Sequence, residues 1–424
     1  MSRILITTLG TLGDLHPMIA VALELRQRGH DTVFVTHQVY QSKIEALGFE
    51  FYSMRPDFTA INDSEEMARM MDLKTGQEYM VRQWVNPNLR EMYTDLLNVA
   101  KGVDFIFSGE GVIATPLVAE KLGMRWASSA MVPMSFFSAY DPPVLAPFPS
   151  LAKLYKLGSM VNQGIINFAK LVSNSWADPI RQLRRELGLS PIDYNPFIEN
   201  RFSPYLVVTL FSSVFGQPQP DWSANTVVAG FTFYDGTQSG AELTPALKKF
   251  LEVGDPPIVF TLGSAAVMDA GNFYQESIQA AKQLNRRAVL LIGKNSPPEN
   301  LSPDVIAVNY APYSQIFPRA CAIAHQGGIG TTAQALRAGR PTLIMPYSHD
   351  QPDNAARAKR LGTSLTIPRK QYSAARVAKE LSELLGNPNY AANATKIGRI
   401  VQAENGVGVA CNAIEKQLSN CRVC

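Results

Sequence analysis

The sequence predicts an α/β protein built from two doubly wound, Rossmann-like domains, and three observations lead to this prediction. The chain has 424 residues, which is more than one hydrophobic core usually supports. Residues 3–9 read RILITTL, a buried-strand pattern, and a glycine turn and a helical stretch follow at once. The same plan of strand, glycine turn and helix returns over residues 257–283. We therefore expect two similar halves that face each other across a cleft.

Composition and charge exclude several classes of function. Hydrophobic residues make up 46% of the chain and the formal net charge is +3, so nucleic acid is not an expected partner. No segment reaches the roughly 18 apolar residues that span a bilayer, and the N-terminus lacks the apolar core of a signal peptide. The cysteines show no metal-ligand spacing with a histidine. We expect a cytoplasmic protein without a metal site.

The first strand ends in a tight turn, GTLGD at residues 10–14, which leads into a helix over residues 16–28. The second strand, residues 33–36, is followed by His37. The turn does not match the pattern GxGxxG, and His37 is not the acidic residue that would hold a ribose. The sequence therefore disfavours a dinucleotide-dependent oxidoreductase.

Asp14 and His16 are the two candidates in this turn for a general base. A histidine titrates near neutral pH, whereas a carboxylate needs a raised pKa or a close hydrogen bond to act there. Alternatively, Asp14 is only the N-cap of the helix and His16 is a solvated helix residue. The residues of the turn alone leave this choice open.

Three stretches of the first half are candidates for the wall of an apolar acceptor pocket. An irregular polar connection begins at Asn62 and ends at Trp84, and such segments tend to carry specificity. A buried strand over residues 103–108 is followed by Glu110. Residues 133–149, PMSFFSAYDPPVLAPFP, form a proline-bounded stretch whose aromatic and sulfur side chains suit an apolar pocket or, equally, the underside of a loop. These side chains are Met134, Phe136, Phe137 and Tyr140.

The pattern over residues 151–176 predicts an amphipathic helix. Its apolar stripe is made by Leu154, Leu157, Val161, Ile165, Phe168 and Val172. A helix of this kind can rest on a membrane surface and receive a lipidic acceptor. More often the stripe packs on its own domain, so peripheral membrane contact stays open as an alternative.

Residues 320–354 carry the most specific pattern in the chain. A buried strand over 320–324 runs to His325, and a turn rich in glycine follows, so a ligand can approach the backbone N–H groups closely. Thr331 and Thr332 can cap the next helix, and Gly339 stands where that helix is expected to end. A helix N-terminus beside such a turn binds phosphate or pyrophosphate.

A polar loop follows the next predicted strand, residues 341–346. It carries His349, Asp350, Gln351, Asp353 and Asn354. Ligands of open α/β sheets bind at this edge, and carboxylate and amide groups suit sugar hydroxyls, which donate and accept hydrogen bonds. The turn and the loop together predict a nucleotide-sugar site.

This region resembles the donor signature of inverting glycosyltransferases with the GT-B fold, in the UDP-glycosyltransferase superfamily. It is most similar to the bacterial branch of lipid rhamnosyltransferases and sterol glucosyltransferases, whose pattern H-x-G-G-x-G-T-T is followed after a strand by D-Q-x-x-N. The matching residues are His325, Gly327, Gly328, Gly330, Thr331, Thr332, Asp350, Gln351 and Asn354. The first turn resembles the G-D-x-x-P of that branch, which favours Asp14 over His16 as the base.

The resemblance implies an enzyme that transfers a hexose from a UDP- or dTDP-sugar to a hydroxyl of a small apolar acceptor, by direct displacement and without a metal or other cofactor. The donor-binding residues that it implies are Gly13, Ser264, Ala311, His325, Gly327, Gly328, Gly330, Thr331, Thr332, Gln334, Asp350, Gln351 and Asn354. The acceptor-binding candidates are Trp84, Glu110, Met134, Phe136, Phe137 and Tyr140.

A stretch rich in Gly, Pro, Ser and Thr after Phe215 marks the expected domain boundary. The expected organisation is an acceptor-binding domain (1–215), a linker (216–245), a nucleotide-sugar-binding domain (246–403) and a last helix that returns to the first domain (404–424). Two other functions stay open: a GT-B sugar-nucleotide epimerase and a non-catalytic nucleotide-sugar binding protein. The pattern does not set the sugar, the acceptor or the oligomeric state.

Overall fold

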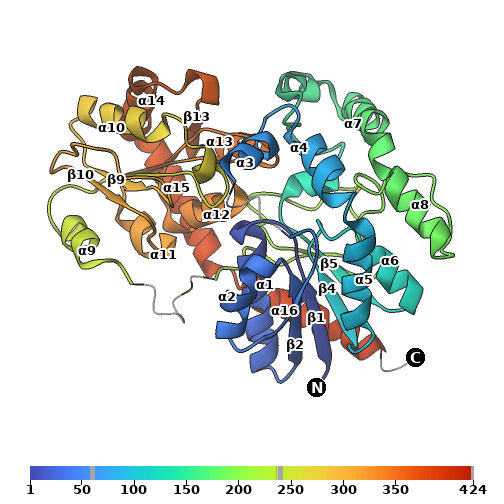
Figure 1. Cartoon of the computed structure of the whole chain (residues 1–424). Coiled ribbons are helices and arrows are strands. Elements are labelled where there is room, and N and C mark those ends of the chain that lie inside the picture. Colours follow the sequence, from blue (N-terminus) through green and yellow to red (C-terminus); the bar gives the residue numbers. More distant parts are fainter. Residues whose placement is uncertain (58–62, 235, 237–241, 422–424) are drawn as a thin grey trace.

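Two α/β halves lie side by side in the computed structural model, which describes residues 1–57, 63–234, 236 and 242–421 (Figure 1). Within these residues the N-terminal half holds a seven-stranded parallel sheet in the order β3-β2-β1-β4-β5-β6-β7. Its strands are β1 (Arg3–Thr7), β2 (Asp31–Thr36), β3 (Glu50–Ser53), β4 (Phe105–Ser108), β5 (Trp126–Ala130), β6 (Val207–Thr209) and β7 (Thr226–Val228). The central strands are rows of buried apolar residues, as strands covered on both faces require.

The C-terminal half repeats this architecture with a six-stranded parallel sheet among its described residues, in the order β10-β9-β8-β11-β12-β13. Its strands are β8 (Ile258–Thr261), β9 (Ala288–Leu291), β10 (Val305–Val308), β11 (Ala322–His325), β12 (Thr342–Ile344) and β13 (Ser364–Thr366). The prediction of two doubly wound domains is confirmed. The strand order reverses between β1 and β4 and between β8 and β11, and open sheets bind ligands at the carboxyl ends of such strands.

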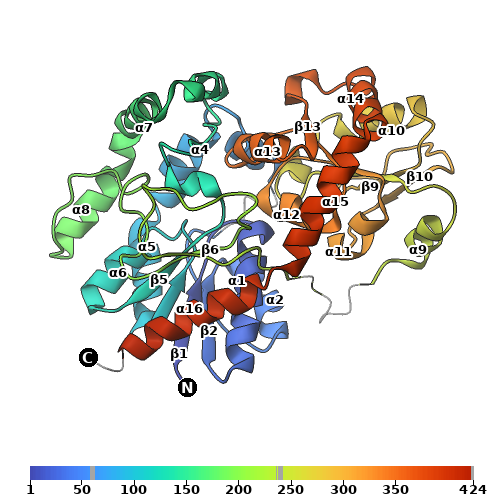
Figure 2. The same cartoon turned by 180° about the vertical axis from the view of Figure 1, so that it is seen from behind.

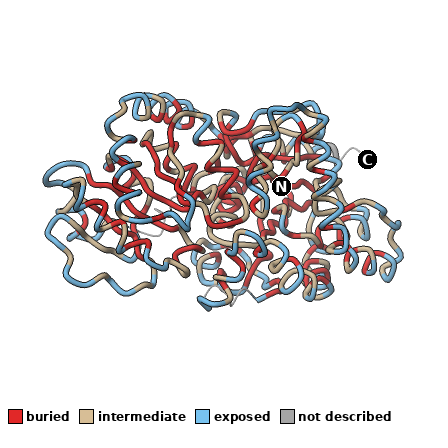
Figure 3. Tube along the Cα trace, turned by 90° about the horizontal axis from the view of Figure 1, so that it is seen from above, coloured by how far each residue is buried: buried red, intermediate tan, exposed pale blue. Residues whose placement is uncertain are grey.

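Helices cover both faces of the two sheets, and the buried segments run through the interior of both halves (Figure 3). The N-terminal helices are α1 (Leu12–Gln27), α2 (Gln41–Ala46), α3 (Ser64–Met70), α4 (Gly76–Tyr79), α5 (Leu89–Ala100), α6 (Thr115–Leu122), α7 (Ser159–Ser173) and α8 (Asp178–Glu186). The C-terminal helices are α9 (Pro245–Glu252), α10 (Phe273–Gln283), α11 (Tyr313–Ile316), α12 (Ile329–Ala338), α13 (Gln351–Arg360), α14 (Ala374–Gly386), α15 (Pro388–Ala403) and α16 (Gly406–Cys421).

Two helices begin earlier than the sequence predicts. In α1 the N-cap is Thr11, so Asp14 lies inside the first turn and is not the cap. In α12 the N-cap is Gly328, so Thr331 and Thr332 also lie inside the helix, where the Thr332 hydroxyl donates to the Gly328 carbonyl (3.0 Å). Gly10 and Gly327 precede these two helices and have positive φ angles, which glycine adopts easily. They let each chain segment turn early enough for the helix to begin sooner.

The segment over residues 151–176 is not one helix. It forms the 3₁₀ helix η5 (Pro149–Leu157), then α7 after a break at Gly158 (φ 102°), then the short η6 (Asn174–Ala177). Most of the predicted apolar stripe is exposed, whereas Asn162, Ile166 and Ser173 form the buried side of α7. The interpretation that the stripe packs on its own domain is therefore wrong for most of its length.

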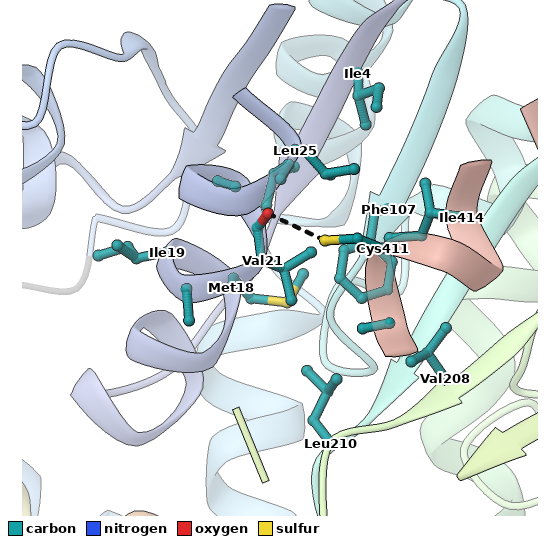
Figure 4. Packing of buried hydrophobic residues seen from close by; sticks show 14 of the residues in the cluster. Ile4, Met18, Ile19, Val21, Leu25, Phe107, Val208, Leu210, Cys411 and Ile414 are labelled. Carbon is teal, nitrogen blue, oxygen red and sulfur yellow. Dashed lines mark hydrogen bonds between the residues drawn. The ribbon is translucent and has the colours of Figure 1, made fainter. Parts of the chain in front are cut away.

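The last helix, α16, lies against the N-terminal domain, as the view from behind shows (Figure 2). Its residues Ala410, Cys411, Ile414 and Leu418 belong to the same buried cluster as residues of α1 and β1. The Cys411 thiol also donates to the Val21 carbonyl of α1 (3.7 Å, Figure 4). This packing ties the C-terminal end of the chain to the first domain.

A buried ionic network joins the two domains beside the cleft. The Arg357 guanidinium of α13 donates to Asp353 (2.6 Å), one turn earlier, and to Asp141 of the N-terminal domain. Asp353 also accepts from the Val144 backbone N–H of the N-terminal domain (2.9 Å). The Arg357 side chain is 1% exposed, so its charge depends on these partners.

The helix α3 also crosses between the domains. Although it lies early in the chain, its residues Met67 and Met71 pack in the buried cluster of the C-terminal domain, next to η8 (Ala266–Asp269). The Ser348 hydroxyl of the C-terminal domain donates to the Asp72 carbonyl just after α3 (2.9 Å). One wall of the cleft is therefore shared by both domains.

None of the helices in the described parts of the chain is both long enough and apolar enough to cross a bilayer. Part of the predicted linker, residues 235 and 237–241, and the end of the predicted last helix, residues 422–424, lie outside the described residues.

Replacement of Arg357 by Met is expected to destabilise the protein strongly, because it leaves the buried Asp353 carboxylate without its cation and Asp141 with the exposed Arg360 alone. The expected loss is about 3–5 kcal/mol, measured from urea unfolding followed by circular dichroism. Arg360→Met is the matched control: Arg360 lies on the same helix and also binds Asp141, but its side chain is 59% exposed, so the loss is expected to stay under about 1 kcal/mol. Equal losses in both variants would contradict this assignment.

Candidate active site

The carboxyl ends of the strands at both switch points open into one cleft between the domains. Asp14 follows β1 and Glu110 follows β4 on one side, and Ser264 follows β8 on the other. The turn that leads from β11 into α12 completes that second side. The cleft has a volume of about 1260 Å³, which is larger than a typical site for one small ligand. It therefore has room for two substrates.

The first turn of α1 holds the Asp14 carboxylate in a capping box. The Thr11 backbone N–H donates to Asp14 Oδ2 (2.8 Å), and the Gly13 N–H donates to the Thr11 hydroxyl (3.3 Å). Gly10 has a φ of 120°, and a Cβ there would lie 2.3 Å from Asp14 Oδ2. Only glycine therefore lets the carboxylate fold back over the turn.

A buried histidine fixes this turn from behind. The Gly10 N–H donates to His37 Nε2 (3.1 Å), and His37 Nδ1 contacts the Pro56 carbonyl (2.9 Å), so Nδ1 carries the proton. Burial lowers the pKa of His37 to about 4, which keeps the ring neutral. The Tyr40 hydroxyl donates to the Gly10 carbonyl (2.9 Å). His37, which follows β2, thus has a structural role: it holds the turn that presents Asp14.

Burial raises the pKa of the Asp14 carboxyl to about 6. The hydrogen bond from Thr11 opposes this shift, and the negative charge of Glu110 adds to it. Glu110 is held by Arg201 (3.3 Å) and by the Met131 N–H (3.2 Å), both in the N-terminal domain. Asp14 is therefore a carboxylate that is ionised above about pH 6 and still basic enough to take a proton near neutrality.

On the opposite side, the turn after β11 depends on glycine at two points. Gly327 has a φ of 92°, and a Cβ there would lie 2.8 Å from Ile344 Cγ2. A Cβ on Gly330 would lie 3.6 Å from the Cα of Gly13, so the N-terminal ends of α12 and α1 meet across the cleft. In the first turn of α12 the N–H groups of Gly330 and Thr331 have no partner within the helix, and both residues line the cleft.

His325 lies beneath this turn and does not itself line the cleft. The Gly327 N–H donates to His325 Nδ1 (3.0 Å), which places the ring proton on Nε2. Burial lowers the pKa of His325 to about 3, so the ring is neutral. Among the described residues Nε2 is buried without a hydrogen-bond partner.

Asp350 stands at the end of the loop after β12, directly before α13. Its carboxylate accepts from the Ile329 N–H of α12 (3.2 Å) and from the Asn354 side-chain amide (2.6 Å). Burial and, to a smaller extent, the charge of Asp14 across the cleft raise the pKa of Asp350 to about 7. The two carboxyls therefore face each other closely enough to affect each other's ionisation.

The other polar residues of this loop differ in what they can do. Gln351 lines the cleft, but its side-chain oxygen accepts from the Tyr347 N–H (2.8 Å), so only its amide N–H groups remain for a ligand. Asn354 is buried and holds the turn by donating to the Gly327 carbonyl (2.9 Å). Asp353 serves the interdomain network, and His349 contacts the Gln77 side chain of α4 (3.0 Å).

The predicted donor residues divide into two groups. Those that line the cleft are Gly13, Ser264, Ala311, Gly328, Gly330, Thr331, Gln334, Asp350 and Gln351. Those that lie behind it are His325, Gly327, Thr332 and Asn354. The structure thus brings the first group to one cleft from several segments of the chain, and the second group lies behind the turn between β11 and α12 and at the start of α13.

The N-terminal side of the cleft widens into a largely apolar chamber. Of the predicted acceptor residues, Trp84, Glu110, Met134 and Phe137 line it. Phe136 and Tyr140 do not: Phe136 stacks on Trp222 (3.8 Å between ring centroids) on the opposite side of its turn, and Tyr140 is exposed on the surface. In the 3₁₀ turn η4 (Pro133–Phe136) neighbouring side chains point in different directions, so a run of aromatic residues cannot all face one pocket.

Several residues of this chamber are not among those that the sequence predicts. They include Met67, Met70, Met71, Met80, Trp176 and Phe197. A signal was present, because four methionines fall between positions 67 and 80 and flexible Met side chains are common on surfaces that bind varied apolar ligands. The remaining residues come from distant segments that only the fold brings together.

Asp14 and His16 both line the cleft from the first turns of α1, but they have different neighbours. Asp14 lies between Glu110, on the chamber side, and Asp350, on the sugar-loop side. The His16 ring is half-buried and edge-on to Tyr234 (5.1 Å between ring centroids). Burial and the nearby Tyr310 raise the pKa of Tyr234. His16 is therefore not a solvated helix residue, and Asp14 is the one of the two that lies close to the carboxyls of both Glu110 and Asp350.

No group of three or more His, Cys, Asp or Glu side chains that could hold a metal ion gathers within the residues described. The absence of a metal requirement stays a prediction.

Comparisons with known proteins agree with this geometry. Residues 4–117 match the Glycosyltransferase family 28 N-terminal domain, and residues 276–406 match the Erythromycin biosynthesis protein CIII-like, C-terminal domain. The chain is 29% identical to O-mycaminosyltylonolide 6-deoxyallosyltransferase of Streptomyces fradiae, over 98% of this chain and 97% of that protein. It is 27% identical to the sterol 3-beta-glucosyltransferase of Neurospora crassa, over 99% of this chain but only 27% of the relative's length.

Solved structures share the fold over the whole chain. The glycotransferase of kitacinnamycin superposes with a TM-score of 0.74 at 18% identity, covering 98% of this chain and 99% of that one. The glycosyltransferase VinC, solved in complex with dTDP, superposes with a TM-score of 0.64 at 17% identity, covering 97% and 98%. The fold, the family matches and the relatives agree, and the chain belongs to the glycosyltransferases of the GT-B fold.

Proposed function

We propose that this glycosyltransferase transfers a hexose from a UDP- or dTDP-sugar to a hydroxyl of an apolar acceptor, such as a sterol, another terpenoid, a lipid or a polyphenol, with inversion at the anomeric carbon. One observation carries the proposal. The helix end that suits a diphosphate, α12, meets the turn that holds Asp14, and an apolar chamber opens beside that turn.

In this proposal Asp14 is the general base. Its carboxylate takes the proton of the acceptor hydroxyl, and the oxygen attacks the anomeric carbon from the face opposite the diphosphate. The carbon–oxygen bond to the diphosphate breaks in the same step, which inverts the configuration. The raised pKa of Asp14 supports this role, because a base with a pKa near the working pH is efficient and remains ionised.

The leaving diphosphate gains negative charge as its bond to the sugar breaks. The free N–H groups of Gly330 and Thr331 at the start of α12, with Ser264 on the facing turn, stabilise that charge. His325 supports the same role from behind, since its Nδ1 accepts from the Gly327 N–H and holds the backbone of the turn. Helix N-termini supply the positive charge here, without a metal ion.

Asp350 and Gln351 orient the sugar. Asp350 keeps acceptor capacity towards the cleft, and Gln351 offers its amide N–H groups. A carboxylate beside an amide donor matches a sugar, whose neighbouring hydroxyls both donate and accept. The relatives support a hexose or a deoxyhexose, since one is named a glucosyltransferase and one a deoxyallosyltransferase.

The acceptor occupies the apolar chamber. Its methionine and aromatic lining suits a large, rigid apolar molecule with few polar groups. One relative is named for a sterol, which is a molecule of this kind, and another for a glycosylated tylonolide. An epimerase would have no use for this chamber, and a protein that only binds the nucleotide sugar would have no use for a carboxylate of raised pKa beside it.

The test is a transfer screen by mass spectrometry, with UDP-glucose and dTDP-rhamnose offered separately against sterols, hydroxy-lipids, carotenoids, macrolide aglycones and polyphenols. A product heavier by one hexose or deoxyhexose, together with release of the nucleoside diphosphate, is the expected result. A changed sugar on an intact nucleotide would replace this proposal with an epimerase.

Asp14→Asn is expected to lower kcat/KM by about 10²–10⁴, because it removes the base and keeps the size of the side chain. The affinity for the nucleoside diphosphate, measured by calorimetry, should change little, since the donor lies mainly on the other domain. His16→Ala is the comparison, with a smaller loss expected. If Asp14→Asn retained full glycosyl transfer and His16→Ala abolished it, the base would be His16.

The value of kcat/KM is expected to fall as the pH drops below about 6, because Asp14 becomes protonated there and no longer accepts a proton. Glu110→Gln removes a negative charge that raises the pKa of Asp14, so the acidic limb should move to lower pH. Glu186→Gln, which alters a surface pair with Arg90 away from the cleft, should leave the limb in place. If the acidic limb does not move in Glu110→Gln, the limb does not report the ionisation of Asp14.

Asp350→Asn is expected to weaken binding of the nucleotide sugar by about 10–100-fold, through loss of a charged hydrogen-bond acceptor. Binding of the free nucleoside diphosphate should stay close to the wild-type value, because Asp350 contacts the sugar in this proposal. Calorimetry with both ligands separates the two effects. An equal loss for both ligands would assign Asp350 to the shape of the turn instead.

A further inference from the structure

The outer surface of η5 and α7 is unusually apolar. Fifteen large apolar side chains are exposed in the described parts of the chain, and seven of them fall in this one segment. They are Phe148, Leu154, Leu157, Met160, Phe168, Leu171 and Val172. The most exposed are Met160 at 89%, Leu171 at 75% and Leu157 at 66%. We call these seven residues the apolar patch. Figure 1 shows α7 on the outer edge of the N-terminal half.

The exposed face of α7 lacks the charged residues that a water-facing helix normally carries. Its exposed positions follow helical spacing, and they are Met160, Gln163, Gly164, Asn167, Phe168, Leu171 and Val172. No Asp, Glu, Lys or Arg is among them. The face that points into the protein carries Asn162 and Ser173 with Ile166, so the apolar side of this helix points outward. A membrane interface favours that arrangement.

The charges within the segment that carries the apolar patch have one sign. Residues 142–177 contain three lysines and no acidic residue. Lys153 and Lys156 are exposed and form no ion pair with a described residue, whereas Lys170 pairs with Glu199 (2.9 Å). The nearest acids on either side are also neutralised, since Asp141 binds Arg357 and Asp178 binds Arg181. A surface of anionic lipid headgroups complements this charge.

The patch is continuous with the acceptor chamber. Phe148 and Val172 are exposed to solvent and also line the cleft. The Phe148 ring lies edge-on to that of Phe168 (6.0 Å between centroids), which joins the chamber wall to the outer face of α7. The cleft therefore reaches the surface of the protein within the patch.

We propose that the outer face of η5 and α7 docks on a bilayer that contains anionic lipid, with the apolar patch inserted between headgroups and Lys153 and Lys156 against the phosphates. The acceptor then passes from the bilayer into the chamber between Phe148 and Val172. The docking stands independently of the proposed function, whereas the passage of an acceptor rests on it.

A second copy of the chain fits this surface less well. A twofold dimer would place the patch against itself and bring the lysines of both copies together with no acid between them. Such like charges oppose association. A bilayer supplies both an apolar phase and the missing negative charge.

The test is flotation of the full chain with phosphatidylcholine vesicles, with and without phosphatidylglycerol, in the absence of any donor or acceptor. Binding to the anionic vesicles is expected, and Met160→Asp with Leu171→Asp should weaken it at least about tenfold, because burial of one such side chain accounts for that much affinity. Both positions are exposed and neither lines the cleft, so folding and turnover of a soluble acceptor should persist.

Two controls make the test specific. Val253→Asp places the same charge on another exposed apolar residue, in the C-terminal domain, and should leave flotation unchanged. Lys153→Gln with Lys156→Gln should reduce the preference for anionic vesicles by about fivefold for each lysine. Equal flotation of the wild type and the Met160/Leu171 variant would overturn the proposal. So would a concentration-dependent dimer that this variant abolishes, without any binding to vesicles. Neither result depends on glycosyl transfer.

Discussion

The N-terminal ends of α1 and α12 meet across the cleft, and the rest of the site depends on this contact. Each end carries partial positive charge, so two such ends approach closely only with negative charge between them. Each domain brings one carboxylate to its own helix end: Thr11 donates to Asp14, and Ile329 donates to Asp350. Because both carboxyls are buried, their pKa values rise, which makes one of them a suitable base and prepares the space for a diphosphate.

The division of labour between the domains follows from the same contact. In the proposed function, the C-terminal domain binds the donor through the backbone groups of one polar turn, and the side chains that support this turn lie buried behind it. In the same proposal, the N-terminal domain supplies the base and an adaptable apolar chamber. Helix α3 blurs this division, because Met67 and Met71 pack into the C-terminal core. The chamber therefore takes part of its shape from the domain that binds the donor.

The sequence was informative where one local constraint decides the structure. Gly327 and Gly339 take left-handed backbone conformations, and Gly330 leaves room for the opposing helix, so glycine at these positions is readable from the chain itself. The direction of a side chain in an irregular segment is set by distant partners. Phe136 points away from the chamber because Trp222 offers a stacking surface. Local sequence patterns likewise do not predict that the apolar stripe points outward after Gly158. They also do not predict that α3 packs against the C-terminal domain.

Helix α13 joins two tasks within two turns. Its start carries Asp350 and Gln351 in the cleft, and Asp353 in the same turn and Arg357 in the next bind the N-terminal domain. Laboratory evolution of a new donor range would naturally target the first of these turns. Because the same rigid segment also sets the spacing between the domains, a change that tilts it to fit another sugar will also move the base relative to the acceptor. Donor range and acceptor geometry are therefore best diversified together, with compensating changes around Asp141 and Val144.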